Sequence, residues 1–278
     1  MKKYKIYSQI VSCFCFSLLG LQIKILLESL PTESIVFFRF LIGSFIVLSL
    51  LLITKKKIYL SKNFLIHLLR SFFGVFATYF GYKTLTYITL SQATTIGFTK
   101  VFFASIFASI IFKERFLFKY FILILIGFIG VLVITGPITL QNHGIYYGLL
   151  SAMCVSGGII SISFLVKNDS SFTVIFYHSI ISTIIFFLIF HQKISFNIID
   201  YLFPLLLLTI TALVGQYFNA ESYKDSRTNL IVILSYLRII FSTALGFFFL
   251  NEEISLHTIL GIVLIVISTI YVKKEIIK

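Results

Sequence analysis

Acidic residues are scarce in this 278-residue chain, which has ten Asp and Glu against 23 Lys and Arg. Charged residues make up 12% of the sequence and hydrophobic residues 59%. A soluble domain is usually about a quarter charged and nearer half apolar. Because the surplus apolar residues form long blocks, the composition argues against a single soluble core and indicates an integral membrane protein.

Cysteine and proline are also rare. The cysteines Cys13, Cys15 and Cys154 lie inside apolar blocks, with no CxxC or histidine-rich context. We therefore interpret them as small buried hydrophobic residues and expect no metal site. The three prolines lie near the ends of apolar blocks, so bending within a block would have to rely on glycine.

Motifs for catalysis are missing as well. The chain has no GxSxG, no HExxH, no DxD-like metal cluster and no glycine loop that could cradle a phosphate. We therefore expect no enzymatic activity and no cofactor. A channel would show repeated pore-lining polar residues or a filter-like loop, and neither is visible in the sequence.

The apolar blocks predict ten membrane-spanning helices, because a helix needs about 20 apolar residues to cross the hydrocarbon layer. Backbone groups in hydrocarbon must find internal partners, so helices are the structure that fits blocks of this length. The predicted fold class is therefore all-α integral membrane. The ten spans are residues 7–27, 34–54, 63–84, 90–112, 116–135, 145–166, 172–190, 202–222, 228–250 and 255–272.

The basic residues predict the orientation of these spans. With the N-terminus placed in the cytoplasm, 16 of the 23 Lys and Arg fall on the cytoplasmic side, whereas the opposite side carries Lys193 and several acids. The positive-inside rule then places both termini in the cytoplasm. The net charge of +13 is explained by membrane topology, so we expect the lipid bilayer and not a nucleic acid as partner.

The two halves of the chain resemble each other. "SCFCFS" at 12–17 matches "SAMCVS" at 151–156 at an offset of 139, and "IIFKERFLFK" at 110–119 meets "FFLNEEISLH" at 248–257 at an offset of 138. Five spans per half is an odd number, so the halves should enter the membrane in opposite senses. The sequence thus predicts two inverted five-helix repeats, residues 1–140 and 141–278, an architecture that recurs in transporters.

Two cations occupy matched positions in these halves. Lys100 in "IGFTKVFFASIFASIIFKE" and Arg238 in "SYLRIIF" are related by the offset of 138, and each lies ten residues into its predicted span. A cation facing lipid at that depth would cost about 3 kcal/mol or more. All ten acids fall in loops or at span ends, so a buried acidic partner is not expected. We therefore predict that Lys100 and Arg238 face a central cavity and bind a carboxylate or phosphate.

Further polar residues in the spans are candidates for the same site, each with a structural alternative. Arg39 and Arg70 could equally snorkel to the interface, and His178, which matches Arg39, could titrate or serve as a structural imidazole. The hydroxyls of tyrosines and the amides of glutamines could orient a substrate or simply pack. These additional candidates are Tyr79, Tyr236, Gln92 and Gln216.

The stretches "FKERFLFKYFILILIGFIGVLVI" and "LNEEISLHTILGIVLIVISTIYV", each with Glu just past a span, resemble the EamA family of the drug/metabolite transporter superfamily. Within that family, "VFFRF", "HLLR" and "SYLRIIFSTALGFFFLNE" are similar to the S-adenosylmethionine uptake carriers of host-dependent bacteria. The resemblance implies a ten-helix carrier of small metabolites. This chain lacks the proline that the family often has near Lys100 and Val101.

Together these features predict a secondary carrier of the bacterial inner membrane that moves a small organic metabolite with an anionic group by alternating access. With no acid at mid-membrane to carry a proton, exchange or facilitated movement is favoured over proton coupling. S-adenosylmethionine uptake is the alternative, although a cavity holding two cations would repel its sulfonium. A non-transporting membrane subunit is a third possibility, and the protein could be a monomer or a homodimer.

Overall fold

The computed structural model describes residues 2–54, 61–88, 90–111, 118–135, 143–224, 228–250, 256–257, 259–264 and 266–267. Every regular element in these ranges is helical. The α-helices are α1 (Lys2–Leu26), α2 (Thr32–Thr54), α3 (Phe64–Tyr87), α4 (Leu90–Gly97), α5 (Lys100–Ile111), α6 (Phe118–Thr135), α7 (His143–Leu165), α8 (Ser171–Phe190), α9 (Leu202–Tyr223), α10 (Thr228–Leu234) and α11 (Leu237–Leu250). Two short 3-10 helices, His191–Lys193 and Ile199–Tyr201, connect α8 to α9.

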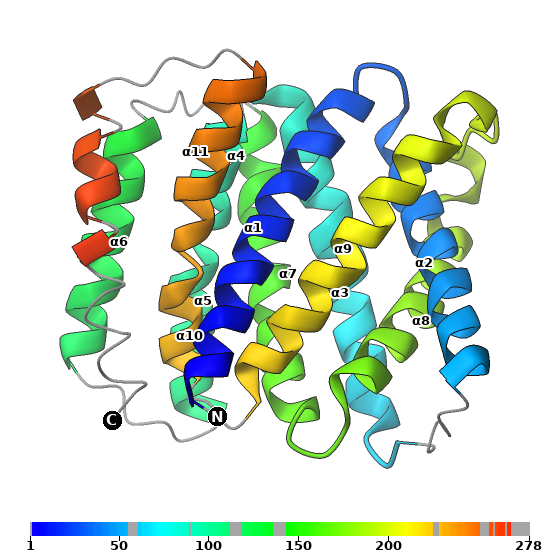
Figure 1. Ribbon diagram of the computed structural model, residues 1–278, viewed down its shortest axis with the longest axis horizontal. Helices are drawn as coiled ribbons and strands as arrows, with labels where there is room; N and C mark the ends of the chain where they lie inside the picture. The colour runs from blue at the N-terminus through cyan, green and yellow to red at the C-terminus, as the bar shows by residue number, and fades with distance from the viewer. Residues whose placement is uncertain are drawn as a thin grey trace.

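The long helices run side by side between two ends of the molecule (Figure 1). The N-terminal end of α1 and the turn between α7 and α8 lie at the lower end of this view, and the connection from α8 to α9 lies at the upper end. In the described part of the chain, seven helical segments are long and apolar enough to cross a membrane. The protein is therefore an all-helical membrane protein, as the sequence predicts.

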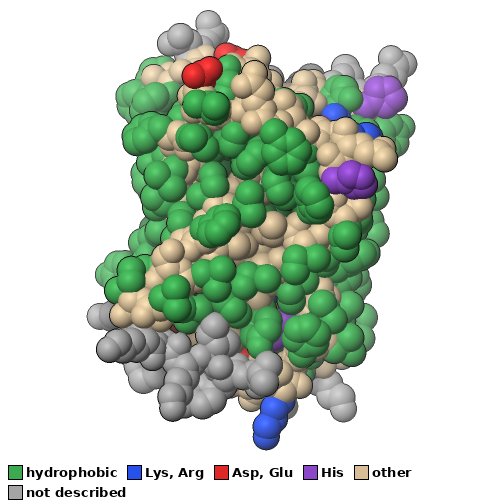
Figure 2. All heavy atoms as spheres, turned by 90° about the vertical axis from the view of Figure 1, so that its right-hand side faces the viewer, with side chains coloured by type: hydrophobic (Ala, Val, Ile, Leu, Met, Phe, Trp, Pro, Cys, Tyr) green, Lys and Arg blue, Asp and Glu red, His purple; other side chains and the backbone are tan. Residues whose placement is uncertain are grey.

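Apolar side chains cover much of the outer surface. Leu52, Ile53 and Phe203 are each exposed over three quarters or more of their area. Figure 2 shows that hydrophobic side chains occupy the middle of one face, while the coloured charged and histidine side chains lie toward its ends. Apolar side chains exposed in this way suit contact with lipid and would be unfavourable in water.

Two predicted spans differ from expectation because each is interrupted. The predicted span 90–112 divides into α4 and α5 around Phe98 and Thr99, and 228–250 divides into α10 and α11 around Ser235 and Tyr236. The Thr99 hydroxyl donates to the carbonyl of Ile96 at 2.7 Å, and the Ser235 hydroxyl donates to the carbonyl of Val232 at 2.5 Å. Both hydroxyls bond to the carbonyl three residues back, so each break coincides with a side-chain bond that apolar content alone does not reveal.

Small residues allow the central helices to approach closely. A Cβ at Gly81 on α3 would lie 3.1 Å from the Ser151 hydroxyl on α7, and one at Gly148 on α7 would lie 2.6 Å from Ile96 on α4. The Ser151 hydroxyl also donates to the Ala77 carbonyl at 2.8 Å. Close packing of this kind drives helix association in lipid, where burying apolar side chains brings no gain.

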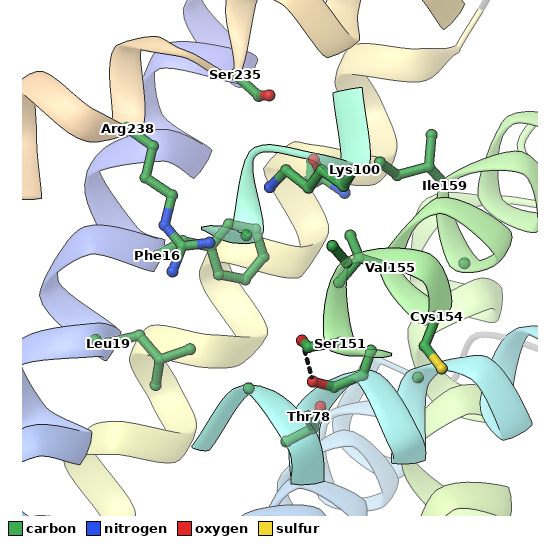
Figure 3. A pocket seen from close by; sticks show the side chains of 18 of the residues that line it. Phe16, Leu19, Thr78, Lys100, Ser151, Cys154, Val155, Ile159, Ser235 and Arg238 are labelled. Atoms are coloured by element: carbon green, nitrogen blue, oxygen red, sulfur yellow. Dashed lines mark hydrogen bonds between the residues drawn. The ribbon is translucent and has the colours of Figure 1, made fainter. Parts of the chain in front are cut away.

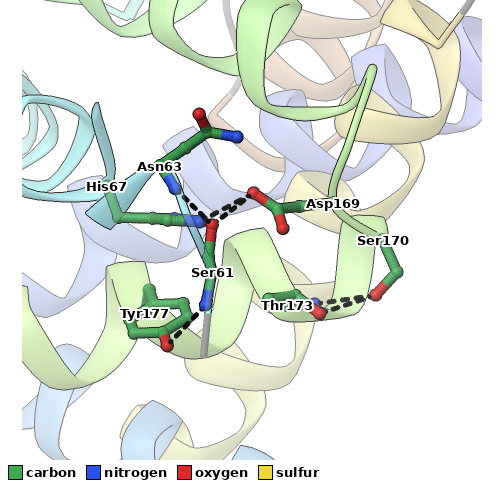
Figure 4. Close-up of polar contacts among 7 residues, drawn as sticks. All are labelled: Ser61, Asn63, His67, Asp169, Ser170, Thr173 and Tyr177. Atoms are coloured by element: carbon green, nitrogen blue, oxygen red, sulfur yellow. Dashed lines mark hydrogen bonds and ion pairs between the residues drawn. The ribbon is translucent and has the colours of Figure 1, made fainter. Parts of the chain in front are cut away.

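A polar cluster joins the start of α3 to the connection between α7 and α8 (Figure 4). His67 Nε2 lies 3.1 Å from Asp169 Oδ2, which also accepts a hydrogen bond from the Ser61 hydroxyl at 2.8 Å. The fully buried His67 ring lies 4.4 Å from the Tyr177 ring, centroid to centroid. The cluster thus holds the two halves of the sequence together at one end of the bundle.

Candidate functional site

A cavity of about 260 Å³ lies among the central helices and is lined by residues of both halves of the chain. Cavities that enclose drug-sized ligands usually measure about 300–1,000 Å³, so this one suits a small molecule. Six of the predicted site residues line it: Lys100, Arg238, Arg70, Arg39, His178 and Gln216.

Lys100 and Arg238 lie beside the two helix breaks. Lys100 is the first residue of α5, and Arg238 is the second residue of α11. Their side chains extend into the same space from different helices (Figure 3). Lys100 Nζ lies 4.9 Å from the centre of the Phe98 ring, and the guanidinium carbon of Arg238 lies 5.6 Å from that of Phe16. These ring faces offset part of the cost of holding a cation away from bulk water.

Arg39, Arg70 and His178 form a second group in the same cavity. Arg39 donates to the Thr78 hydroxyl at 3.3 Å. Arg70 Nη1 and the His178 ring both approach Gly74, where an added Cβ would lie 2.6 Å from Arg70 Nη1 and 3.2 Å from His178 Nδ1. His178 Nδ1 also lies 3.0 Å from the Ser182 hydroxyl, so the imidazole has a structural partner.

None of the described residues that line the cavity is acidic, so no carboxylate there balances these positive charges. The ion pairs described in the structure are His67 with Asp169 and Lys83 with Glu33, and neither involves a cavity cation. A buried charge without a partner is costly, and a functional site is the usual reason for keeping one in a membrane span. Charge-assisted hydrogen bonds to an anion would offset this cost.

The other predicted residues lie elsewhere. The Tyr79 hydroxyl donates to Glu33 Oε1 at 3.0 Å, and the Tyr236 hydroxyl donates to the carbonyl of Ile124 at 3.0 Å. Neither is among the residues that line the cavity. Gln92 belongs to α4, but its side chain lies outside the described part of the structure.

Several lining residues were not singled out by sequence reasoning. Cys13 lies close enough to interact with the positive charges of both Lys100 and Arg238. Tyr82, Asn219 and Phe98 also line the cavity. Cys13 and Phe98 sit in apolar runs, where nothing marks them as different from core. Tyr82 is marked by helical spacing, because it follows Arg70, Gly74 and Thr78 at intervals of four residues. Asn219 is a polar residue inside the predicted span 202–222, which is the signal that could have found it.

Three comparisons place the chain among known proteins. A sequence profile of the EamA-like transporter family matches it twice, over residues 4–136 and 142–273. The pseudopaline exporter CntI of Pseudomonas aeruginosa is 25% identical over 276 residues, covering 95% of this chain and 94% of the exporter. The S-adenosylmethionine uptake transporter of Rickettsia prowazekii is 26% identical over 257 residues, covering 90% of this chain and 85% of that transporter.

A solved crystal structure shares the fold, with a TM-score of 0.78 at 15% sequence identity, and the likeness covers 97% of this chain and 98% of the other. Because the family profile accounts for nearly all of the sequence, this chain belongs to the EamA-like transporter family.

Proposed function

We propose that this protein is a secondary carrier that moves a small organic metabolite with an anionic group across the bacterial inner membrane. The observation that carries the proposal is the cavity, whose described lining holds Lys100 and Arg238 and no acid. Arg238 would bind a carboxylate or phosphate through its two-pronged guanidinium, and Lys100 would add a point charge.

The carrier would consist of ten helices in two inverted repeats, residues 1–140 and 141–278. The double match of the family profile supports this division. Hydrogen bonds also repeat across the halves, because Ser17 donates to the Arg238 carbonyl at 2.8 Å and Ser156, its counterpart at an offset of 139, donates to the Lys100 carbonyl at 3.1 Å.

Contacts between matched residues further support a pseudo-twofold axis. Ser44 and Thr183, separated by 139 positions, lie 3.0 Å apart through their hydroxyl oxygens. The rings of Phe98 and Tyr236, separated by 138 positions, stack with centroids 5.1 Å apart. A residue touches its own counterpart only near the axis that relates the two halves, so the axis would pass through both contacts.

Alternating access would follow from this architecture. In inverted-repeat transporters, interrupted helices commonly surround the substrate, and one repeat moves against the other around it. Here the breaks at 98–99 and 235–236 lie beside the two cations. Because no acid lines the described cavity, exchange or facilitated movement is favoured over proton coupling.

S-adenosylmethionine uptake is the second candidate, favoured by the likeness to the Rickettsia prowazekii transporter. The charge of the cavity opposes it. A sulfonium ion would enter a space lined by Lys100, Arg238, Arg39 and Arg70 without a described acid to compensate the repulsion. Competition between labelled S-adenosylmethionine and organic anions would separate the two candidates.

Uptake by purified protein in liposomes tests the proposal. We expect Lys100→Gln and Arg238→Gln each to lower uptake of an anionic substrate about tenfold or more, because a charged hydrogen bond is worth about 1.5–3 kcal/mol. Lys83→Gln is the matched control, since Lys83 is paired with Glu33 outside the cavity lining. Wild-type uptake by folded Lys100→Gln and Arg238→Gln would refute the proposed binding role, and strict dependence on a pH gradient would refute exchange.

A further inference from the structure

The cavity cations fall into two groups held by different helices. Lys100 and Arg238 come from α5 and α11, whereas Arg39 and Arg70 come from α2 and α3. The two groups also rest on different rings. Phe98 and Phe16 face the first group, and the guanidinium carbon of Arg39 lies 5.3 Å from the centre of the Phe40 ring and 5.7 Å from that of Tyr82.

Each group keeps a buried donor without a partner. Arg238 Nε and Arg70 Nε are both inaccessible and make no hydrogen bond in the structure. A buried N–H group that lacks an acceptor is unfavourable, and nearly all such groups in folded proteins are satisfied. Each group therefore contains a guanidinium whose hydrogen-bonding capacity the described protein does not fully satisfy.

Tyr82 links the two groups. Its side chain is 6% exposed and lines the cavity, and the guanidinium carbon of Arg39 lies 5.7 Å from the centre of its ring. Its hydroxyl lies close enough to interact with the positive charge of Arg39 in one group and of Arg238 in the other. A hydroxyl at this position could donate to the part of a ligand that spans both groups.

A ligand with a single charged group would satisfy one pair of cations and leave the other pair uncompensated, because the described lining holds no acid. The volume of about 260 Å³ suits a small molecule. A compact compound with an anion at each end matches both constraints, provided that its spacer reaches from one group to the other.

We propose that the cargo is a small dianion whose two anionic groups, carboxylate or phosphate, bind separately, one to Lys100 and Arg238 and the other to Arg39 and Arg70. This inference rests on the proposed function, because it takes the first pair of cations as a substrate site. It goes further by assigning the second pair as a subsite and by requiring a cargo with two charged ends.

Binding to purified protein in nanodiscs, measured by titration calorimetry, tests the inference with matched probes. The probes are dicarboxylates from malonate to adipate, each compared with the monocarboxylate of equal carbon number, and 3-phosphoglycerate compared with glycerol 3-phosphate. We expect the best probe with two anionic groups to bind at least about tenfold more tightly than its counterpart with one anionic group, the factor expected if the second group adds one charged hydrogen bond.

Single substitutions test which pair of cations binds each anionic group of the dianion. Arg39→Gln and Arg70→Gln should weaken binding of the dianion about tenfold and leave the monoanion within about twofold, whereas Lys100→Gln and Arg238→Gln should weaken both. Arg39→Lys keeps the charge and should recover part of the loss, which guards against a fold defect. Lys83→Gln should leave both affinities unchanged.

The outcomes separate the two proposals. Equal affinity for dianion and monoanion, with Arg39→Gln and Arg70→Gln unchanged and Lys100→Gln and Arg238→Gln weakened, would overturn the dianion and keep the anion carrier. If Lys100→Gln and Arg238→Gln bind every probe as the wild type does, or no probe binds at all, both proposals are overturned.

Discussion

A lysine or arginine inside a membrane span is kept only where its environment offsets the cost of leaving water. Lys100 and Arg238 each lie near an aromatic ring and border a cavity. Lys24 is accommodated in a different way, since its ammonium donates to the carbonyls of Leu85 at 2.8 Å and Ile88 at 3.2 Å at the end of α3. The same residue type therefore serves a helix end in one place and a candidate binding site in another.

Glycine next to Arg70 provides a test at the scale of one residue. Gly74→Ala would place a Cβ 2.6 Å from Arg70 Nη1 and in conflict with His178 Cε1, so both side chains would have to move. Overpacking of this kind costs about 1–3 kcal/mol. We expect uptake of an anionic substrate by folded Gly74→Ala protein to fall about tenfold, as measured in liposomes at equal protein content.

Gly158→Ala is the matched control, because its Cβ would lie 3.6 Å from the same nitrogen, an ordinary contact. This variant should transport as the wild type does. Equal activity of Gly74→Ala and Gly158→Ala would mean that the position of Arg70 has no bearing on transport.

Among the helices, the two interrupted segments differ from the rest. Each break is followed by a helix that carries a cavity cation at its first or second residue, and the residues Phe98 and Tyr236 at the breaks stack on one another. Tyr236 is fully buried, and its hydroxyl bonds to the carbonyl of Ile124 on α6. The tyrosine thus ties the break before α11 to two other helices, which fixes the backbone next to Arg238.

This role predicts an unequal response to two truncations. Tyr236→Ala should lower the free energy of unfolding by about 3 kcal/mol or more, the loss typical of a buried aromatic residue, and Tyr236→Phe by about 1 kcal/mol through one hydrogen bond. Unfolding in dodecyl sulfate, followed by circular dichroism, measures both. Phe248→Ala, whose side chain is 73% exposed, should change little; a loss equal to that of Tyr236→Ala would contradict the packing role.

The long helices could be predicted from the sequence because their lengths follow from the thickness of the membrane. The predicted span 172–190 and α8 (Ser171–Phe190) differ by one residue at their start. The break at 98–99 directly follows Gly97, a glycine of the kind on which bending was expected to rely, whereas the break at 235–236 has no neighbouring glycine or proline and was missed. The offset of 138 between the halves predicted that Lys100 and Arg238 face a cavity, and both residues line one. The direction in which a tyrosine side chain points could not be predicted in a chain with 17% aromatic residues.

At the scale of the whole molecule, the order of the helices and the positions of the lysines together predict how the protein is oriented in the membrane. The N-terminal end of α1 and the turn between α7 and α8 lie at one end of the bundle, and the connection from α8 to α9 lies at the other (Figure 1). The N-terminal end carries Lys2, Lys3 and Lys5, and the turn carries Lys167. By the positive-inside rule, we predict that this end faces the cytoplasm.

Labelling of single cysteines tests this orientation. In a background without native cysteines, Asn168→Cys would lie in the turn between α7 and α8, and Ser195→Cys in the connection from α8 to α9, both at exposed positions. A membrane-impermeant maleimide added to intact cells should label Ser195→Cys and leave Asn168→Cys unlabelled until the membrane is opened. The reverse pattern would place the termini outside and would invert the direction in which each proposed repeat faces the cytoplasm. Since both positions flank the same helix, α8, one span separates them and the two results must be opposite in any valid topology.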